Sequence, residues 1–378
     1  MKVKINGKNL EHFTDISLKR SLDSIASTFS ISVRFNAEND DHKELFKPLQ
    51  YFDIQIYSDS GELLFTGTIL NHAFKSDSGF NLLVISGYSK CGILEDVTIP
   101  PSMYPLESIN RSLKDIAEKL CNAYGIKIIY NLEGDLDIDS NYTKNFDTKI
   151  KKYVAPKRKR KKTNNSEVNR VYKKSNADAT ESVKSYLTKL TSQRNILLSH
   201  DNEGNIVLFK PNLKAKPKYY FNKDNTLSMS STWNGQAMHS QINVVRQPSA
   251  ENAGVSTVDK VDSFYVKKYR PTTKVLSSGE DTDTKKAAEN EYAAELKNIS
   301  LSIELEGIFF DINPGDLINV HNQEIYSFAY SRWIVSDIDF SINTNENKTN
   351  INLQLPESFS GEVEQNSLFY YESHKRNN

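Results

Sequence analysis

Histidines are the side chains that most readily bind metals or move protons near neutral pH, and this chain of 378 residues has seven of them. They are scattered, and no two stand at zinc-ligand spacing beside a further ligand. The sequence also has no GxSxG, GxGxxG or P-loop motif. We therefore expect no metal site, no cofactor and no enzymatic activity. The seven residues are His12, His42, His72, His200, His239, His321 and His374.

Two groups of carboxylates were considered as a calcium site and as an acid–base pair. Residues 135–139 (DLDID) begin like a calcium-binding loop, but Ser140 stands where glycine is needed and Phe146 where glutamate is needed. Glu304 and Glu306 alternate with apolar residues, as on the solvated face of a strand. We interpret the first group as an acidic loop and the second as strand surface, so neither predicts a reaction.

One segment is strongly basic, the run KRKRKK at residues 157–162. Such a run could bind phosphates, but it lacks the interleaved aromatic residues of a surface that binds single strands. Two interpretations stay open: a solvated loop, or an electrostatic contact with an acidic neighbour or with passing DNA. The residues concerned are Lys157, Arg158, Lys159, Arg160, Lys161 and Lys162.

The composition limits the classes of protein that fit. Lys plus Arg and Asp plus Glu number 48 each, and this balance argues against a dedicated binder of nucleic acid or anionic membrane. No apolar run approaches ~18 residues, so we expect no membrane insertion. The N-terminus MKVKINGKNL lacks an apolar signal core, which favours synthesis in a cytoplasm. We expect Cys91 and Cys121 to be buried thiols without a catalytic role.

Strands are predicted at both ends of the chain, with a mixed segment between them. Short alternating segments bounded by turns, such as FDIQIY, predict antiparallel β structure. Helical spacing predicts helices over 108–124 and 180–193, and a composition rich in Ala, Glu and Lys predicts a third over 285–298. We expect a loop over 249–263. The predicted domains are a first β-barrel domain at 1–95, an α+β module at 96–212 with a basic polar loop at 150–176, a second β-barrel domain at 213–358 and a polar tail at 359–378.

The two β regions resemble each other in pattern. FDIQIY, FTGTILNHAF and NLLVISG follow one another in the first region, as DLINVH, RWIVSDIDFS and NINLQL do in the second. Phe74 and Phe340 fall at equivalent places. Either the chain holds two copies of one barrel, or the likeness is the one that any two antiparallel meanders share. Under the first interpretation, three chains would form a ring with threefold and approximate sixfold symmetry.

The stretch SLKRSLDSIASTFSISV, residues 17–33, reads as a strand, one capped helical turn at Asp23–Ala26, and a returning strand. It resembles the opening motif of the baseplate hub proteins of contractile-tailed, Mu-like bacteriophages, a family related to the T-even phage hub and the type VI secretion spike base. Further segments resemble that family in the same order, over most of residues 1–358. They are GYSKCGILEDVTIP, SLKDIAEKLCNAYGI, ESVKSYLTKLTSQRNILLSHDNEGNIVLFKP, FFDINPGDLINV and RWIVSDIDFSINTNENKTNINLQLPESF.

The resemblance implies a fold and an assembly. The fold is mainly β with an α+β insert: two tube-type antiparallel β-barrel domains flanking a small α+β module. The assembly is a homotrimer in the tail baseplate of a virion, assembled in the host bacterial cytoplasm. The implied partners are the central spike protein, tail tube or tube-adaptor proteins and other baseplate proteins, with transient passage of DNA through the bore. The helical turn would let the sheet widen where it curves, and polar residues at alternate positions of residues 13–35 would face that bore.

Three other functions stay open. The chain could be a spike-base protein of a type VI secretion or phage-tail-like bacteriocin particle, a cell-wall-binding tail protein, or a cell-wall hydrolase. A hydrolase would need a catalytic acid, and the sequence offers no candidate for one. For barrel core or inter-subunit contact we predict five large side chains, Phe29, Phe35, Phe74, Trp333 and Phe340.

Overall fold

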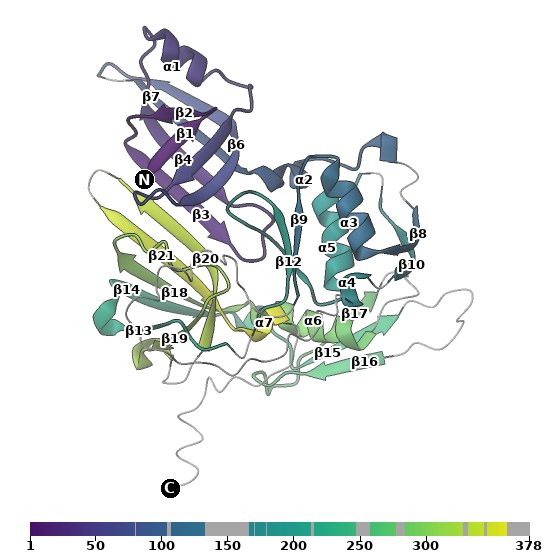
Figure 1. Ribbon diagram of the computed structural model, residues 1–378. Helices are drawn as coiled ribbons and strands as arrows, with labels where there is room; N and C mark the ends of the chain where they lie inside the picture. Colours follow the sequence, from purple (N-terminus) through teal and green to yellow (C-terminus); the bar gives the residue numbers. More distant parts are fainter. Residues whose placement is uncertain are drawn as a thin grey trace, which may run out of the picture.

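The computed structural model is mainly β with an α+β insert, as predicted (Figure 1). The basic run 157–162, the acidic segment 135–139 and the end of the predicted tail, from residue 361, lie outside the described residues. The structure describes residues 1–79, 81–103, 107–132, 166–169, 171–178, 180–212, 215–246, 258–276, 284–327, 332–343 and 346–360.

The first β region is built from strands in which apolar and polar residues alternate, so that one face of the sheet is buried. Neighbouring strands pair antiparallel in the order β3-β4-β7-β6-β5-β1-β2. A short helix joins β4 to β5. The elements are β1 (Lys2–Ile5), β2 (Lys8–Leu10), β3 (Asp15–Ser21), β4 (Thr28–Arg34), α1 (Asp40–Leu45), β5 (Asp53–Tyr57), β6 (Leu63–Ser76) and β7 (Asn81–Ser89).

The second β region repeats the order of the first four strands of the first region and is joined to it. Its strands follow the order β14-β18-β21-β20, with β19 beside the start of β20 and β13 parallel to β19. β20 then pairs with β3, so both regions belong to one 13-stranded sheet over a shared apolar core. The strands are β13 (Tyr219–Asn222), β14 (Ser228–Trp233), β18 (Ile299–Glu306), β19 (Leu317–His321), β20 (Arg332–Ile342) and β21 (Asn347–Gln354).

The α+β module has an apolar core of its own and lies beside the sheet (Figure 1). Its helix over 108–124 was predicted too long, because residues 107–112 form a strand. Ser112 caps the helix that follows: its Oγ accepts from the Asp115 N–H at 3.1 Å, and the Asp115 carboxylate accepts from the Ser112 N–H. The elements are α2 (Ile93–Asp96), β8 (Glu107–Ser112), α3 (Leu113–Asn122), β9 (Ile128–Asn131), α4 (Ser166–Asn169), β10 (Val171–Asn176), α5 (Val183–Ser192), β11 (Leu197–His200) and β12 (Ile206–Phe209).

Between β14 and β18 the chain builds a separate three-stranded sheet that packs on a helix. The loop predicted over 249–263 is wrong for residues 258–262, which form an edge strand beside β15. Only Val258 and Val261 in that strand are apolar, which is too weak a pattern to predict a strand from the sequence. The strand forms because it pairs with the distant segment β15. The elements are β15 (Gln241–Arg246), β16 (Val258–Asp262), β17 (Pro271–Leu276) and α6 (Thr284–Leu296), followed after β21 by α7 (Glu357–Ser360).

The helical turn predicted at Asp23–Ala26 is also wrong. Residues 22–27 are a bent connection without helical hydrogen bonds, and β3 and β4 on either side of it are antiparallel neighbours. The Ser24 hydroxyl bonds the Ala26 backbone, with its oxygen 3.3 Å from the amide nitrogen, and so competes with a helical turn. Ile25 is buried in the core of the α+β module, which holds the connection in this shape.

Candidate functional site

Ser27 and His200 form a serine–histidine contact among the residues that the structure describes. His200 Nε2 lies 2.6 Å from Ser27 Oγ, and Nδ1 lies 2.8 Å from the carbonyl oxygen of Ser24. Burial lowers the pKa of His200 to about 4, so the ring is neutral at pH 7, donating from Nδ1 and accepting at Nε2. A backbone carbonyl stands where a catalytic triad has its carboxylate, and Ser27 is buried. The pair therefore joins β11 to the β3–β4 connection.

The two cysteines confirm the prediction of buried thiols. Both are free, and burial raises the pKa of Cys91 and of Cys121 to about 12, which keeps them protonated. The Cys91 thiol donates to the carbonyl of Ile25 at 2.6 Å, beside the His200 contact. Among the residues that the structure describes, no three His, Cys, Asp or Glu side chains gather as metal ligands. No helix in the same residues is long and apolar enough to cross a membrane.

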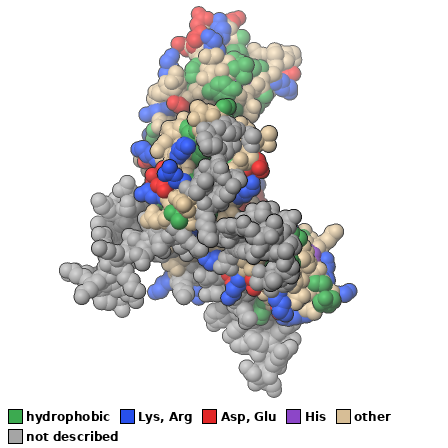
Figure 2. Space-filling view, turned by 90° about the vertical axis from the view of Figure 1, so that its right-hand side faces the viewer, with side chains coloured by type: hydrophobic (Ala, Val, Ile, Leu, Met, Phe, Trp, Pro, Cys, Tyr) green, Lys and Arg blue, Asp and Glu red, His purple; other side chains and the backbone are tan. Residues whose placement is uncertain are grey.

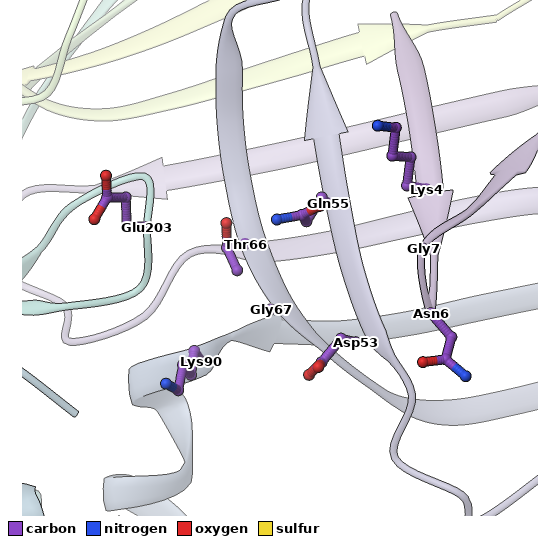
Figure 3. Close-up of a pocket in the computed structure, with 9 residues that line it drawn as sticks. All are labelled: Lys4, Asn6, Gly7, Asp53, Gln55, Thr66, Gly67, Lys90 and Glu203. Carbon is purple, nitrogen blue, oxygen red and sulfur yellow. The ribbon is translucent and has the colours of Figure 1, made fainter. Parts of the chain in front are cut away.

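A polar cavity of ≈ 340 Å³ lies between β1, β5, β6 and the turn that joins β11 to β12 (Figure 3). Lys4 lies over the ring of Tyr57, and Lys90 donates to the carbonyl of Gly125 at 3.0 Å, so both cations already have partners. In Figure 3 the side chains are spread along the strands and do not converge on one point. The cavity is lined by Lys4, Asn6, Gly7, Asp53, Gln55, Thr66, Gly67, Lys90 and Glu203.

The contact between the two β regions is the more informative feature. β3 and β20 pair antiparallel over six residue pairs, from Ile16 opposite Ile342 to Ser21 opposite Asp337. Apolar side chains on one face of this junction are buried, and Leu18 lies opposite Phe340. On the other face Ser17 Oγ donates to Asp339 Oδ1 at 3.1 Å. The junction is therefore an ordinary sheet contact between two units that could equally come from two chains.

The registers of the strands match between the two β regions, as expected if the regions are copies of one unit. Phe74 lies opposite Leu83 in the β6–β7 pair, and the equivalent Phe340 lies opposite Thr349 in β20–β21. Both pairs have a bulge five residues earlier, between Ile69 and Asn71 and between Val335 and Asp337. The β4–β7 and β18–β21 pairs match in the same way. In this correspondence β3 is equivalent to β14, and β6 to β20.

Two strand edges lack the contact that their equivalents make. β14 pairs with β18 on one side, and its other side has no strand partner in the described part of the chain. Residues Asn71–Ser76 of β6 pair with β7 alone, whereas the equivalent residues of β20 pair with both β21 and β3. Phe74 is 48% exposed, and the equivalent Phe340 is 0% exposed. The described chain thus carries two open edges, on β14 and on the second half of β6, that correspond to the two sides of the β3–β20 contact.

Much of the sheet face opposite the core is polar. The exceptions are Leu82, Val84 and Tyr88 of β7, which lie on this face, and Leu317 and Ile334, which are buried there against residues of β12. In residues 15–34 the outward positions are mostly serine, threonine and charged residues, exposed or partly exposed, so the predicted polar face is present. Glu304 on the same face bonds Lys348 at 3.0 Å and also the hydroxyl of Ser228. The bond from Lys348 and, to a smaller extent, the bond from Ser228 lower the pKa of Glu304. Glu304 is therefore an ion-pair partner rather than a proton donor. Figure 2, which shows the side of the molecule at the right of Figure 1, also has acidic and basic side chains interspersed.

The five predicted contact residues occupy different environments. Phe29, Trp333 and Phe340 are buried, Phe35 is partly buried, and Phe74 is about half exposed at the unpaired half of β6. The Phe35 and Phe74 rings are in edge contact with centroids 5.1 Å apart. The six basic residues of the run 157–162 are outside the description.

Sequence reasoning missed β14. Its segment SMSSTW alternates, but its inward positions hold Met229, Ser231 and Trp233, which give only a weak apolar signal. The alternation with outward Ser and Thr could have identified the strand.

Comparisons with solved structures show the fold. A 43 kDa tail protein of prophage MuSo2 from Shewanella oneidensis is 19% identical, with 94% of this chain and 98% of that one covered and a TM-score of 0.72. A tail protein from Neisseria meningitidis MC58 is 16% identical, with 95% and 97% covered and a TM-score of 0.72. No protein-family model and no curated protein matches the chain.

A third structure is more distant. It is an Escherichia coli component of the type VI secretion system, described as structurally similar to the T4 bacteriophage tail proteins gp27 and gp5. It is 10% identical, with 93% of this chain and 76% of that one covered and a TM-score of 0.53. The chain thus has the fold of Mu-like prophage tail proteins over nearly its whole length, as the sequence resemblance implied.

Proposed function

We propose that this chain is the structural hub of a phage tail baseplate, a homotrimeric ring that joins a sixfold tail tube to a threefold spike. The observation that carries the proposal is the β3–β20 junction between two copies of one unit. Each chain supplies two such units and leaves open the two edges equivalent to this junction, on β14 and on the second half of β6. Three chains would then close a ring of six similar units, which has the symmetry of both neighbours.

The polar sheet face would line the bore of this ring. Its outward serines and threonines, interspersed with acidic and basic side chains such as Asp15, Lys19 and Glu304, give a wet surface without a dominant basic field to retain a polyanion. DNA would pass through such a bore during ejection. The spike, the tail tube or its adaptor and other baseplate proteins would contact the two rims.

The role would be structural and not enzymatic, in the tail baseplate of a virion assembled in the host cytoplasm. Support comes from the chemistry already described: the Ser27–His200 contact lacks a carboxylate partner, and both thiols stay protonated. The two tail proteins with a TM-score of 0.72, each covered over nearly its whole length, support a tail protein as the first interpretation.

The ring is tested by the mass of the protein in solution, from light scattering behind a sizing column over a range of concentrations. One chain weighs 43.0 kDa, so a trimer gives three times that mass. We expect a trimer whose class averages in negative-stain microscopy show a central hole with approximate sixfold symmetry. A chain that stays monomeric at every concentration, alone and with its spike, contradicts the proposal.

A further inference from the structure

The strongest unexplained surface is a pair of open strand edges in the shared sheet, one on β14 at one end of the sheet and one along the second half of β6. β14 has an unpaired outer side, and so has the second half of β6. The two edges are not alike, so the natural partner of the β14 edge is a β6 edge, and the natural partner of the β6 edge is a β14 edge. A second copy of this chain is such a partner, and the β3–β20 junction shows how the two edges would fit.

We propose that β14 of one chain pairs antiparallel with residues 71–76 of β6 in the next chain, in the register of the β3–β20 junction. This inference rests on the proposed ring and names the contact that closes it. Equivalent positions follow from the matched registers: Lys19 and Asp339 of the junction correspond to Thr232 and Ala73. The proposed pairs include Ala73 with Thr232, Phe74 with Ser231, and Ser76 with Met229.

Side-chain exposure supports this register. Within the chain, β3 covers Phe340 completely, whereas nothing equivalent covers Phe74, which is 48% exposed. The half-buried Met229 and Ser231 on the core face of β14 would lie over Phe74 in the proposed register. Leu227, which immediately precedes β14, is 51% exposed, so both edges carry apolar surface that pairing would cover.

The register also keeps each face of the sheet consistent across the new contact. Ser230 and Thr232 point to the polar face, as do Ala73 and Lys75. A slip of one residue would turn Phe74 to the polar face and a polar residue to the core, which disfavours any odd displacement. A slip of two residues keeps the faces but separates the proposed partners by roughly 6.8 Å along the strand.

Paired cysteines test the register, because a disulfide forms only when two Cα atoms lie within about 7 Å. The test variant is A73C/T232C, on outward positions that leave the core unchanged. The matched positive control is K19C/D339C, the equivalent pair within one chain. The register control is A73C/S230C, displaced by two residues. The wild type controls for the native Cys91 and Cys121.

Under mild oxidation we expect A73C/T232C to shift from 43.0 kDa to three times that mass on a non-reducing denaturing gel, and to return on reduction. We expect A73C/S230C to stay at the single-chain mass. A trimeric protein in which K19C/D339C closes but A73C/T232C does not, or in which A73C/S230C cross-links instead, overturns this pairing and leaves the ring intact. A chain that light scattering shows to be monomeric throughout overturns the ring and the pairing together.

Discussion

Phe74 and Phe340 are equivalent residues in different surroundings, and this difference gives a quantitative prediction. Phe340 is fully buried on the core face of the β3–β20 junction, and the centroid of its ring lies 5.2 Å from the centroid of the Phe310 ring. Truncating it to alanine leaves a cavity, so F340A should lower the free energy of unfolding by about 3–5 kcal/mol. Phe74 is about half exposed in the single chain. F74A removes only half of a burial worth ~1.5–3 kcal/mol and opens no enclosed cavity, so it should cost about 1 kcal/mol.

In the assembled ring the effect of F74A should be larger than in the single chain, because Phe74 then lies beneath β14 of the next chain. F74A should weaken trimer formation at least about tenfold, the equivalent of ~1.4 kcal/mol. Guanidinium unfolding at a concentration where the protein is monomeric measures the free energy of unfolding of the single chain. The protein concentration at which the mass from light scattering is halfway between monomer and trimer measures the strength of trimer formation. Y269A is the matched control, since Tyr269 is 79% exposed on another part of the molecule and should change neither value.

Two results would refute this reasoning. If F74A destabilises the monomer as much as F340A does, the second half of β6 is already covered within the chain. If F74A leaves the concentration midpoint unchanged, the ring closes through some other surface.

Three further predictions concern the joint between the sheet and the α+β module. Because burial holds the pKa of folded His200 at about 4 against 6.5 for the free side chain, the unfolded chain binds the proton first. The free energy of unfolding should therefore fall by at most about 3 kcal/mol as the pH drops from 6.5 to 4. H200Q should show a flatter pH profile in denaturant titrations, and an equal slope in both proteins rules out His200. Cys91 and Cys121 should stay unreactive toward Ellman's reagent at pH 8 until the protein unfolds, and rapid reaction in the native protein contradicts their burial. I25A should cost about 2–4 kcal/mol and increase hydrogen exchange in β11, whereas exchange unchanged in β11 would show that Ile25 does not hold the module.

Some of this fold follows from the sequence because local patterns are sufficient for it. Alternation identified most strands of the shared sheet. Helical spacing identified α5, and a composition rich in Ala, Glu and Lys identified α6, each within a few residues. The repeat was visible because the three strands β5, β6 and β7 and their equivalents are adjacent in the chain. The equivalence of Phe74 and Phe340 needed no structure, since turn lengths preserve their positions.

The remaining features depend on contacts between distant segments. Nothing in the pattern of Asp15–Ser21 says that β20 will be its neighbour, because a strand edge accepts any backbone of suitable register. β16 forms beside β15 despite a weak pattern of its own. The Asp23–Ala26 segment reads as a helical turn, but Ile25 enters the module core and the Ser24 hydroxyl bonds the backbone instead. Tertiary contacts decide the structure where the local signal is short.

Strand edges that remain open usually invite unwanted pairing, so the open edges of β14 and of the second half of β6 require a reason. The edges are different and complementary, so every added chain would attach in the same sense as the last. Such a heterologous contact closes into a ring only if its rotation divides a full turn, and otherwise it grows into a filament. If the contact between chains repeats the β3–β20 register, the step between chains equals the step within one chain. The register that packs Leu18 over Phe340 would then also decide whether the assembly closes, which ties the core of one chain to the symmetry of the whole ring.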